Sequence, residues 1–156
     1  MMNKKLFDVL YKISGAGAVL SILGMIAAVF VQVFARFLLD SSPGWTEEMA
    51  RIFFIYAVAF GAGPAVRNND YVRLELIERY LSEKGKRSLQ SVILLVSGLF
   101  FLALVYYAWQ FVLIGLPERS PSLETSMGLV FISIFMAFLF ILLFTVERLL
   151  KPNRPT

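Results

Sequence analysis

Long apolar runs separated by short polar segments make up most of the chain. Four of these runs, at about residues 13–39, 47–66, 88–116 and 126–147, are each long enough to cross the ~30 Å hydrocarbon core of a bilayer as a helix rising ~1.5 Å per residue. The segments between them leave no room for a separate soluble domain. The pattern predicts an all-α membrane protein in which residues 1–156 form one transmembrane domain of four helices.

The polar segment between the second and third runs has its own periodicity. At ~100° per residue its apolar side chains fall within an arc of about 160°, with the charged side chains turned away. The apolar members are Leu74, Leu76, Ile77, Tyr80 and Leu81. The pattern predicts a short amphipathic helix over residues 74–84 in the membrane interface, ended by Gly85. A helix packed beneath the four spans against protein would show the same pattern.

Basic residues are distributed unevenly among the connections. Lys4, Lys5 and Lys12 precede the first run; Arg67, Arg73, Arg79, Lys84, Lys86 and Arg87 lie between the second and third; Arg148, Lys151 and Arg154 follow the fourth. By the positive-inside rule, both termini and the central segment are predicted to be cytoplasmic. This topology accounts for the net charge of +4 without a nucleic-acid partner. The first run is too long for a cleaved signal peptide, so it is predicted to be a retained span.

Composition supports the membrane prediction and excludes several kinds of chemistry. The chain is 58% hydrophobic and 17% charged, values that a soluble domain of 156 residues does not have. It has no cysteine, so disulfides, a thiol nucleophile and an iron–sulfur cluster are impossible. It also has no histidine, the usual haem ligand and the commonest general base. We therefore expect no cofactor and no enzymatic activity.

Charged residues lead directly into the second run. Only 15 residues, about 22 Å of helix, separate Arg51 from Arg67, so this span must extend outward through Arg51. Thr46 is a candidate N-cap, which would place Glu47 and Glu48 in the first turn, where the helix dipole favours negative charge. Both carboxylates are also spaced to pair with Arg51 on the same helix.

A second basic residue, Arg36, lies near the outer end of the first run, and either glutamate could pair with it instead. The candidate boundary cluster, with a proposed role in assembly, is Arg36, Trp45, Glu47, Glu48 and Arg51. The alternative is that these side chains only reach toward lipid headgroups. An ordinary aromatic belt at this level, formed by Trp45, Tyr106, Tyr107 and Trp109, would fit that alternative.

Small residues recur at helical spacing in the first two runs and predict close helix packing. One stripe comprises Ser14, Gly17, Ser21, Gly24 and Ala28; the second run offers Ala57 with Gly61, and Ala59 with Gly63. Midway through the spans there is no acid or base of the kind that a proton-coupled carrier needs. The amides there, Gln32 and Gln110, are better explained as hydrogen-bond formers between helices than as substrate ligands.

The run VFARFLLDSSPGWTEEMARIFFIYAVAFGAGPAVRNNDYVRLELI carries a family resemblance. It resembles the most characteristic part of the DctQ-like small membrane subunit of tripartite ATP-independent periplasmic (TRAP) transporters. The matching positions are Arg36, Trp45, Thr46, Glu47, Glu48, Arg51, Gly61, Ala62, Asp70, Val72 and Arg73. The turn before Val72 often carries a histidine in that family, whereas this chain has Asn69, Asp70 and Tyr71.

The resemblance implies a role as an auxiliary subunit in the bacterial inner membrane. In that family a large multi-span subunit carries substrate and sodium by an elevator-type movement, and a periplasmic binding protein delivers the substrate. The small subunit packs against the fixed scaffold of the large one and contacts membrane lipid. The implied solute is a carboxylated organic molecule such as sialic acid or a C4-dicarboxylate. The alternative is a self-sufficient four-span exporter acting as a homodimer, although it would lack the embedded carboxylate that such a carrier needs.

Overall fold

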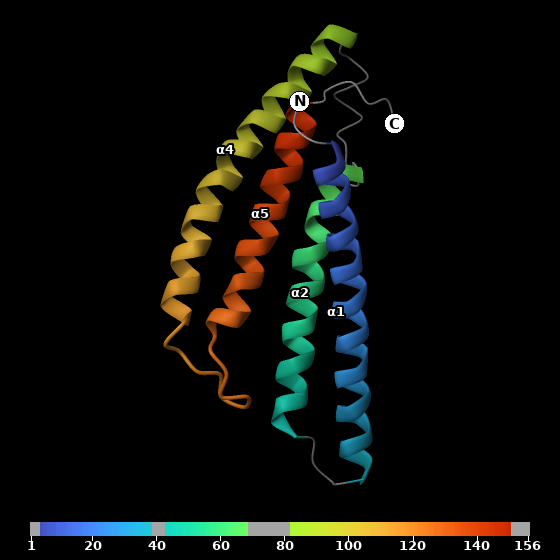
Figure 1. The fold of residues 1–156 in the computed structure, drawn as a ribbon, viewed down its shortest axis with the longest axis vertical. Helices are drawn as coiled ribbons and strands as arrows, with labels where there is room; N and C mark the ends of the chain where they lie inside the picture. Colours follow the sequence, from blue (N-terminus) through green and yellow to red (C-terminus); the bar gives the residue numbers. More distant parts are fainter. Residues whose placement is uncertain (1–3, 39–42, 69–81, 151–156) are drawn as a thin grey trace.

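The computed structural model describes residues 4–38, 43–68 and 82–150 (Figure 1). These residues form four helices: α1 (Lys4–Leu38), α2 (Gly44–Asn68), α4 (Glu83–Gly115) and α5 (Gly128–Leu150). By length and composition, all four could cross a membrane. The predicted all-helical fold with four candidate spans is therefore confirmed for the described part of the chain.

Two helices begin before the predicted membrane spans. α1 begins at Lys4 and α4 at Glu83, whereas the predicted spans begin near residues 13 and 88. The part of α4 that is apolar enough to cross a membrane begins at Ser88. The side chain of Ser82 caps α4 by accepting a hydrogen bond from the Gly85 backbone N–H at 3.3 Å. Gly85 therefore lies in the first turn of α4, and its predicted role in ending an interfacial helix is wrong. Apart from its last residues, the predicted interfacial helix, with Leu74, Ile77, Tyr80 and Leu81, lies outside the described residues.

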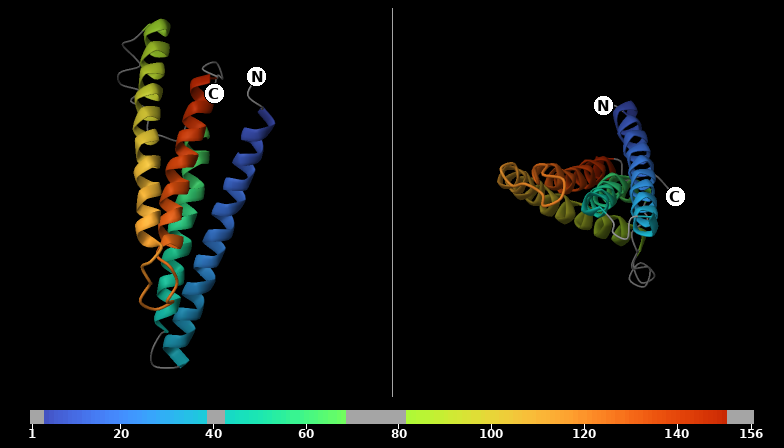
Figure 2. Two further views of the ribbon diagram at one scale, coloured as in Figure 1. Left: turned by 60° about the vertical axis from the view of Figure 1, so that its left-hand side comes forward. Right: turned by 90° about the horizontal axis from the view of Figure 1, so that it is seen from below.

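The four helices form an open row instead of a closed bundle. α1 packs on α2, α2 on α5, and α5 on α4, so α4 stands at one edge of the row (Figure 2). No residue in the most apolar stretch of α4 is buried within the chain. The row therefore presents broad apolar faces that must meet lipid or another protein.

The row of helices has a loop end and a terminal end. At the loop end, the end of α1 lies near the start of α2, and the α4–α5 loop, residues 116–127, connects the other two helices (Figure 1). At the terminal end lie the first turns of α1 and the last turns of α2 and α5. Which of these ends faces the cytoplasm stays a prediction.

The glycines of α1 allow aromatic rings of α2 to approach its backbone. A Cβ atom added at Gly17 would lie 2.7 Å from the ring of Phe60, and one added at Gly24 would lie 2.7 Å from the ring of Phe53. The other members of the stripe, Ser14, Ser21 and Ala28, are buried. The small-residue stripe of α1 thus lies against α2 of the same chain, in the manner of small-residue contacts between membrane helices.

On α2, the two small-residue pairs have different surroundings. Ala59 is buried, and a Cβ atom added at Gly63 would lie 2.7 Å from the Phe144 ring of α5. Ala57 is only half-buried, and nothing lies within 4 Å of a Cβ atom added at Gly61. Of these two pairs, Ala59 and Gly63 therefore face α5 within the chain, while Gly61 meets open space.

Candidate functional site

The start of α2 is held by Thr46, although not in the predicted way. Thr46 is fully buried, its hydroxyl donates a hydrogen bond to the Pro43 carbonyl at 2.7 Å, and its backbone N–H donates to the same oxygen at 3.1 Å. The helix begins at Gly44, three residues earlier than an N-cap at Thr46 would require. Since its hydroxyl donates instead of accepting, the predicted N-cap role of Thr46 is wrong.

The neighbouring carboxylates of α2 have different partners. Glu47 forms an ion pair with Arg51 one turn later, with a separation of 3.1 Å between Oε1 and Nη2. Both side chains are about two-thirds exposed, at 66% and 67%, so the pair is a solvated one worth only ~0.3–0.5 kcal/mol. Glu48 instead accepts hydrogen bonds from the backbone N–H groups of Ser122 and Leu123, at 3.2 and 3.1 Å. One carboxylate thus stays on its own helix, and the other ties the α4–α5 loop to α2.

The loop that Glu48 holds is compact and largely satisfied by its own hydrogen bonds. Arg119 and Ser126 form an antiparallel bridge, and the backbone N–H of Ser120 donates to the Thr125 carbonyl at 2.8 Å. Glu124 turns the chain with a φ of 54°, a left-handed conformation that costs energy for a residue with a side chain. Backbone N–H and C=O groups that are shielded from water need hydrogen-bond partners. The hydrogen bonds within the α4–α5 loop supply such partners.

The remaining members of the predicted boundary cluster stand apart. Trp45 is exposed at the start of α2, and Arg36 is exposed in the last turn of α1. Within residues 4–38, 43–68 and 82–150, Arg36 has no ion pair. Of the five predicted residues, the described part of the chain shows an ion pair between Glu47 and Arg51 alone.

The amides within the spans also differ from expectation. Gln32 is half-buried on α1 and Gln110 is exposed on α4. Neither side chain makes a hydrogen bond to another residue that the structure describes. Their predicted role in joining helices is therefore not seen in these residues.

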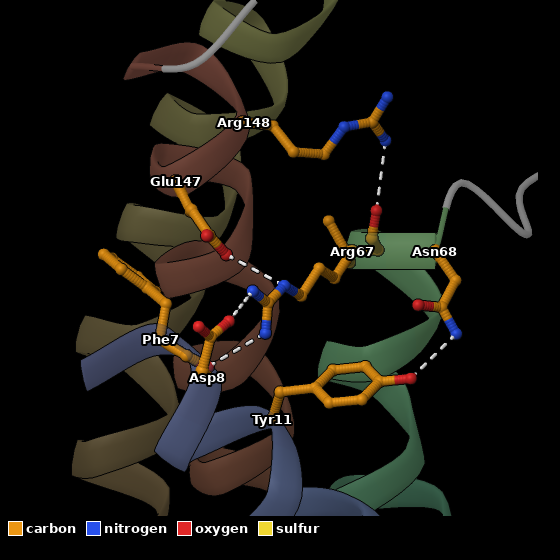
Figure 3. Close-up of polar contacts among 8 residues, drawn as sticks. Phe7, Asp8, Tyr11, Arg67, Asn68, Glu147 and Arg148 are labelled. Carbon is orange, nitrogen blue, oxygen red and sulfur yellow. Dashed lines mark hydrogen bonds and ion pairs between the residues drawn. The ribbon is translucent and has the colours of Figure 1, made fainter. Parts of the chain in front are cut away.

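The strongest polar junction lies at the terminal end and centres on Arg67 of α2 (Figure 3). Its guanidinium forms ion pairs with Asp8 of α1 and, through Nε at 3.4 Å, with Oε2 of Glu147 of α5. It also donates a hydrogen bond from Nη1 to the Phe7 carbonyl at 3.1 Å. We call Asp8, Arg67 and Glu147 the three-helix ion cluster, because each residue comes from a different helix.

Aromatic and apolar side chains surround this cluster. The guanidinium carbon of Arg67 lies 5.0 Å from the centre of the Tyr11 ring and 5.9 Å from that of Phe144, distances typical of cation–π contacts. Phe7, Val66 and Phe144 form a buried apolar core beside it. The Arg67 and Glu147 side chains are only 14% and 5% exposed. Their charges are thus mostly removed from water and depend on each other.

Two further hydrogen bonds tie the same helices together. Arg148 of α5 donates from Nη1 to the Val66 carbonyl near the end of α2, at 3.1 Å. Asn68 donates from Nδ2 to the Tyr11 hydroxyl of α1 at 3.3 Å (Figure 3). The first contact also satisfies one of the carbonyls that the last turn of a helix leaves without a partner.

The three-helix ion cluster was not predicted from the sequence, in which Arg67 counted only as a positive charge at the cytoplasmic edge of a span. One signal was present: Glu147 directly follows the apolar stretch at residues 128–146, where an unpaired carboxylate is costly. Among the described residues, no group of three or more acids could hold a metal ion. Because the charges of the three-helix ion cluster pair with each other, the cluster is suited to hold α1, α2 and α5 together.

Comparisons with known proteins agree with these features. A family model described as "Tripartite ATP-independent periplasmic transporters, DctQ component" matches residues 25–154. The sialic acid TRAP transporter small permease protein SiaQ of Vibrio cholerae is 31% identical over 65 residues, which are 42% of this chain and 38% of that protein. A Haemophilus influenzae protein assigned as a TRAP transporter small permease protein is 22% identical over 138 residues, 84% of this chain and 81% of that protein. The match to the Vibrio protein thus covers less than half of that relative.

Proposed function

Because the chain belongs to the family of DctQ components of TRAP transporters, we propose that it acts as part of the fixed scaffold of such a transporter. In this proposal it forms a complex with a large multi-span transport subunit in the bacterial inner membrane. A periplasmic binding protein contacts the complex transiently and delivers the solute. The family is one of transporter subunits and not of enzymes.

The open row of helices is the observation that supports a scaffold role best. α2 is held to α1 by rings packed over glycines, to α5 through the three-helix ion cluster, and to the α4–α5 loop through Glu48. Because α2 has such contacts near both of its ends, it resists movement relative to α1, α5 and the α4–α5 loop. Many large hydrophobic side chains on the faces of the row remain exposed within the chain. Firm contacts within the chain together with exposed apolar faces are what we expect of a rigid subunit that packs against another membrane protein.

The proposed substrate is a carboxylated organic solute taken up with sodium. One relative is named for sialic acid, which carries a carboxylate, but it matches only 42% of this chain. We therefore propose the class, with sialic acid and C4-dicarboxylates as examples. The termini are proposed to be cytoplasmic, which puts the three-helix ion cluster at the inner surface and Glu48 at the periplasmic one. An interfacial helix that begins near residue 74 and ends before Ser82, where α4 is capped, would fix the depth of the scaffold.

Copurification from native membranes tests the proposal. The tagged chain is isolated in mild detergent, and the proteins that accompany it are identified by mass spectrometry. We expect a large multi-span membrane protein in stoichiometric amount, and loss of solute uptake when the gene for the small chain is deleted. Recovery of the chain alone, as a homodimer that moves solute in liposomes, would refute the scaffold role and favour the exporter.

A further inference from the structure

Ser14 of α1 has a fully buried hydroxyl that makes no hydrogen bond. Its Oγ atom has no partner among residues 4–38, 43–68 and 82–150. A serine inside a helix commonly donates to a carbonyl three or four residues earlier. Ser133, which is equally buried, does so and donates to the Val130 carbonyl. Because a buried hydroxyl without a partner is costly, such groups bond to protein or to ordered water.

On α2, Pro64 deprives a backbone carbonyl of its helical donor. Pro64 lies inside the helix, and proline has no N–H to donate to the carbonyl four residues earlier. That carbonyl belongs to Phe60. In membrane helices, carbonyls beside proline are satisfied by serine or threonine side chains of neighbouring helices or by ordered water. The Phe60 carbonyl therefore needs a donor other than the one that its own helix would normally supply.

The packing of α1 on α2 fixes the level at which the residues of the two helices lie. Gly17 of α1 lies against the ring of Phe60. Seven residues further along α1, Gly24 lies against the ring of Phe53, which is seven residues back along α2. The two helices thus run antiparallel in step, so each residue of α1 can be assigned its level on α2.

This register brings the Ser14 hydroxyl and the Phe60 carbonyl close together. Ser14 lies three residues before Gly17 and is therefore level with Gly63, three residues after Phe60. A carbonyl in an α-helix points along the helix axis toward the residue four positions later, so the Phe60 oxygen lies just below Pro64. The Phe60 ring meets Gly17, so this oxygen is on the side of α2 that faces α1. Both unsatisfied groups thus lie in the same turn of the α1–α2 contact.

We propose that one water molecule binds between the Ser14 hydroxyl and the Phe60 carbonyl and forms a hydrogen bond with each. Water suits both groups, because it donates to the carbonyl and can exchange a hydrogen bond of either direction with the hydroxyl. The two groups also supply the minimum of polar partners that a buried water needs. A bridge is required, since Ser14 makes no direct hydrogen bond to the described residues. The water would join α1 to α2 between the glycine contacts and the three-helix ion cluster.

The test uses two residue pairs that each occur once in the chain. Phe60–Gly61 is the only Phe–Gly pair, so phenylalanine labelled with ¹³C at the carbonyl, together with ¹⁵N-glycine, isolates the Phe60 carbonyl in NMR spectra. Phe144–Thr145 is the only Phe–Thr pair, so ¹⁵N-threonine in the same sample reports the Phe144 carbonyl. This carbonyl is the matched control: Phe144 is fully buried, and the backbone N–H of Arg148 follows at helical spacing in α5.

Solid-state spectra of the full chain in lipid bilayers measure how fast magnetisation passes from water to each carbonyl. We expect faster transfer to Phe60 than to Phe144, and loss of this difference in Ser14→Ala. Pro64→Ala should also abolish it, because alanine supplies the missing backbone N–H. Ser21→Ala is the control variant, since Ser21 is buried on the same stripe two turns away, and it should keep the difference.

Two results would overturn the proposal. The first is equal transfer from water to the two carbonyls in the parent chain, which would mean that no water binds at the Phe60 carbonyl. The second is a difference that survives Ser14→Ala, which would mean that the hydroxyl does not hold the water. The first result needs no variant, so the proposal stays testable even if a replacement disturbs the fold.

Discussion

Replacement of Arg67 by methionine tests whether the three-helix ion cluster stabilises the fold. The Glu147 side chain is 5% exposed, so loss of the guanidinium would remove an ion-pair partner from a carboxylate that is largely buried. Removing one member of a buried ion pair typically costs ~3–5 kcal/mol. Asp8 is about half exposed and can be solvated by water, so it adds little to this cost. We expect Arg67→Met to lower the free energy of unfolding by about 3–5 kcal/mol.

A double-mutant cycle separates the charge effect from the effect of lost packing. When Glu147 is replaced by methionine as well, no carboxylate is left buried, and a buried pair replaced by apolar side chains is often near neutral. The double variant should therefore be more stable than Arg67→Met alone, with an interaction energy of up to about 3 kcal/mol. Arg51→Met is the matched control, because its ion pair is two-thirds exposed and its loss should cost under about 1 kcal/mol.

The assay is reversible unfolding in mixed micelles, titrated with sodium dodecyl sulfate and followed by circular dichroism. Free energies of unfolding are compared among the parent chain, the two single variants, the double variant and the Arg51→Met control. The reasoning is refuted if Arg67→Met costs no more than Arg51→Met. It is also refuted if the effects of the two single replacements simply add in the double variant.

Three further predictions concern the loop and the helix packing. Glu48→Ala should speed hydrogen exchange at the Leu123 amide and cost about 1 kcal/mol, because this partly buried donor loses its charged acceptor and keeps only the Ser120 hydroxyl at 3.3 Å; unchanged exchange would contradict it. Gly17→Ala should destabilise by ~1–3 kcal/mol, since its methyl group would meet an aromatic ring, whereas Gly61→Ala, with nothing within 4 Å, should be neutral or stabilising. Glu124→Gly should raise stability by about 1 kcal/mol by relieving the left-handed φ; a loss of stability would argue against strain at this turn.

The four helices could be predicted from the sequence because lipid leaves the backbone few choices. A run of about twenty apolar residues must satisfy its N–H and C=O groups internally, and a helix does so. The order of the helices in the row could not be predicted in this way. It depends on contacts between residues far apart in the chain, such as Gly17 with Phe60 and Arg67 with Asp8. Small-residue spacing shows that a helix can be approached closely, but not which ring will approach it.

The site could be predicted only in part, for a related reason. Helical spacing indicated that Glu47 and Glu48 could both reach Arg51, and the structure pairs Glu47 with it. Glu48 turns instead to two backbone N–H groups of the α4–α5 loop, and backbone donors leave no trace in a side-chain pattern. The three-helix ion cluster needed the further step of asking what neutralises Glu147 at the end of its span. That question follows from the cost of a buried charge.

The open row of helices explains why hydrogen bonds and ion pairs between helices matter for the stability of this chain. Between membrane helices the hydrophobic effect contributes little, because lipid tails are as apolar as the side chains they replace. A row also has fewer helix contacts than a closed bundle, so α2, which lies between α1 and α5, must be held by specific interactions. It is held at the loop end through Glu48 and at the terminal end through Arg67. A covering subunit would add the packing that the row lacks, so we expect the chain to unfold at a higher temperature within the complex than alone.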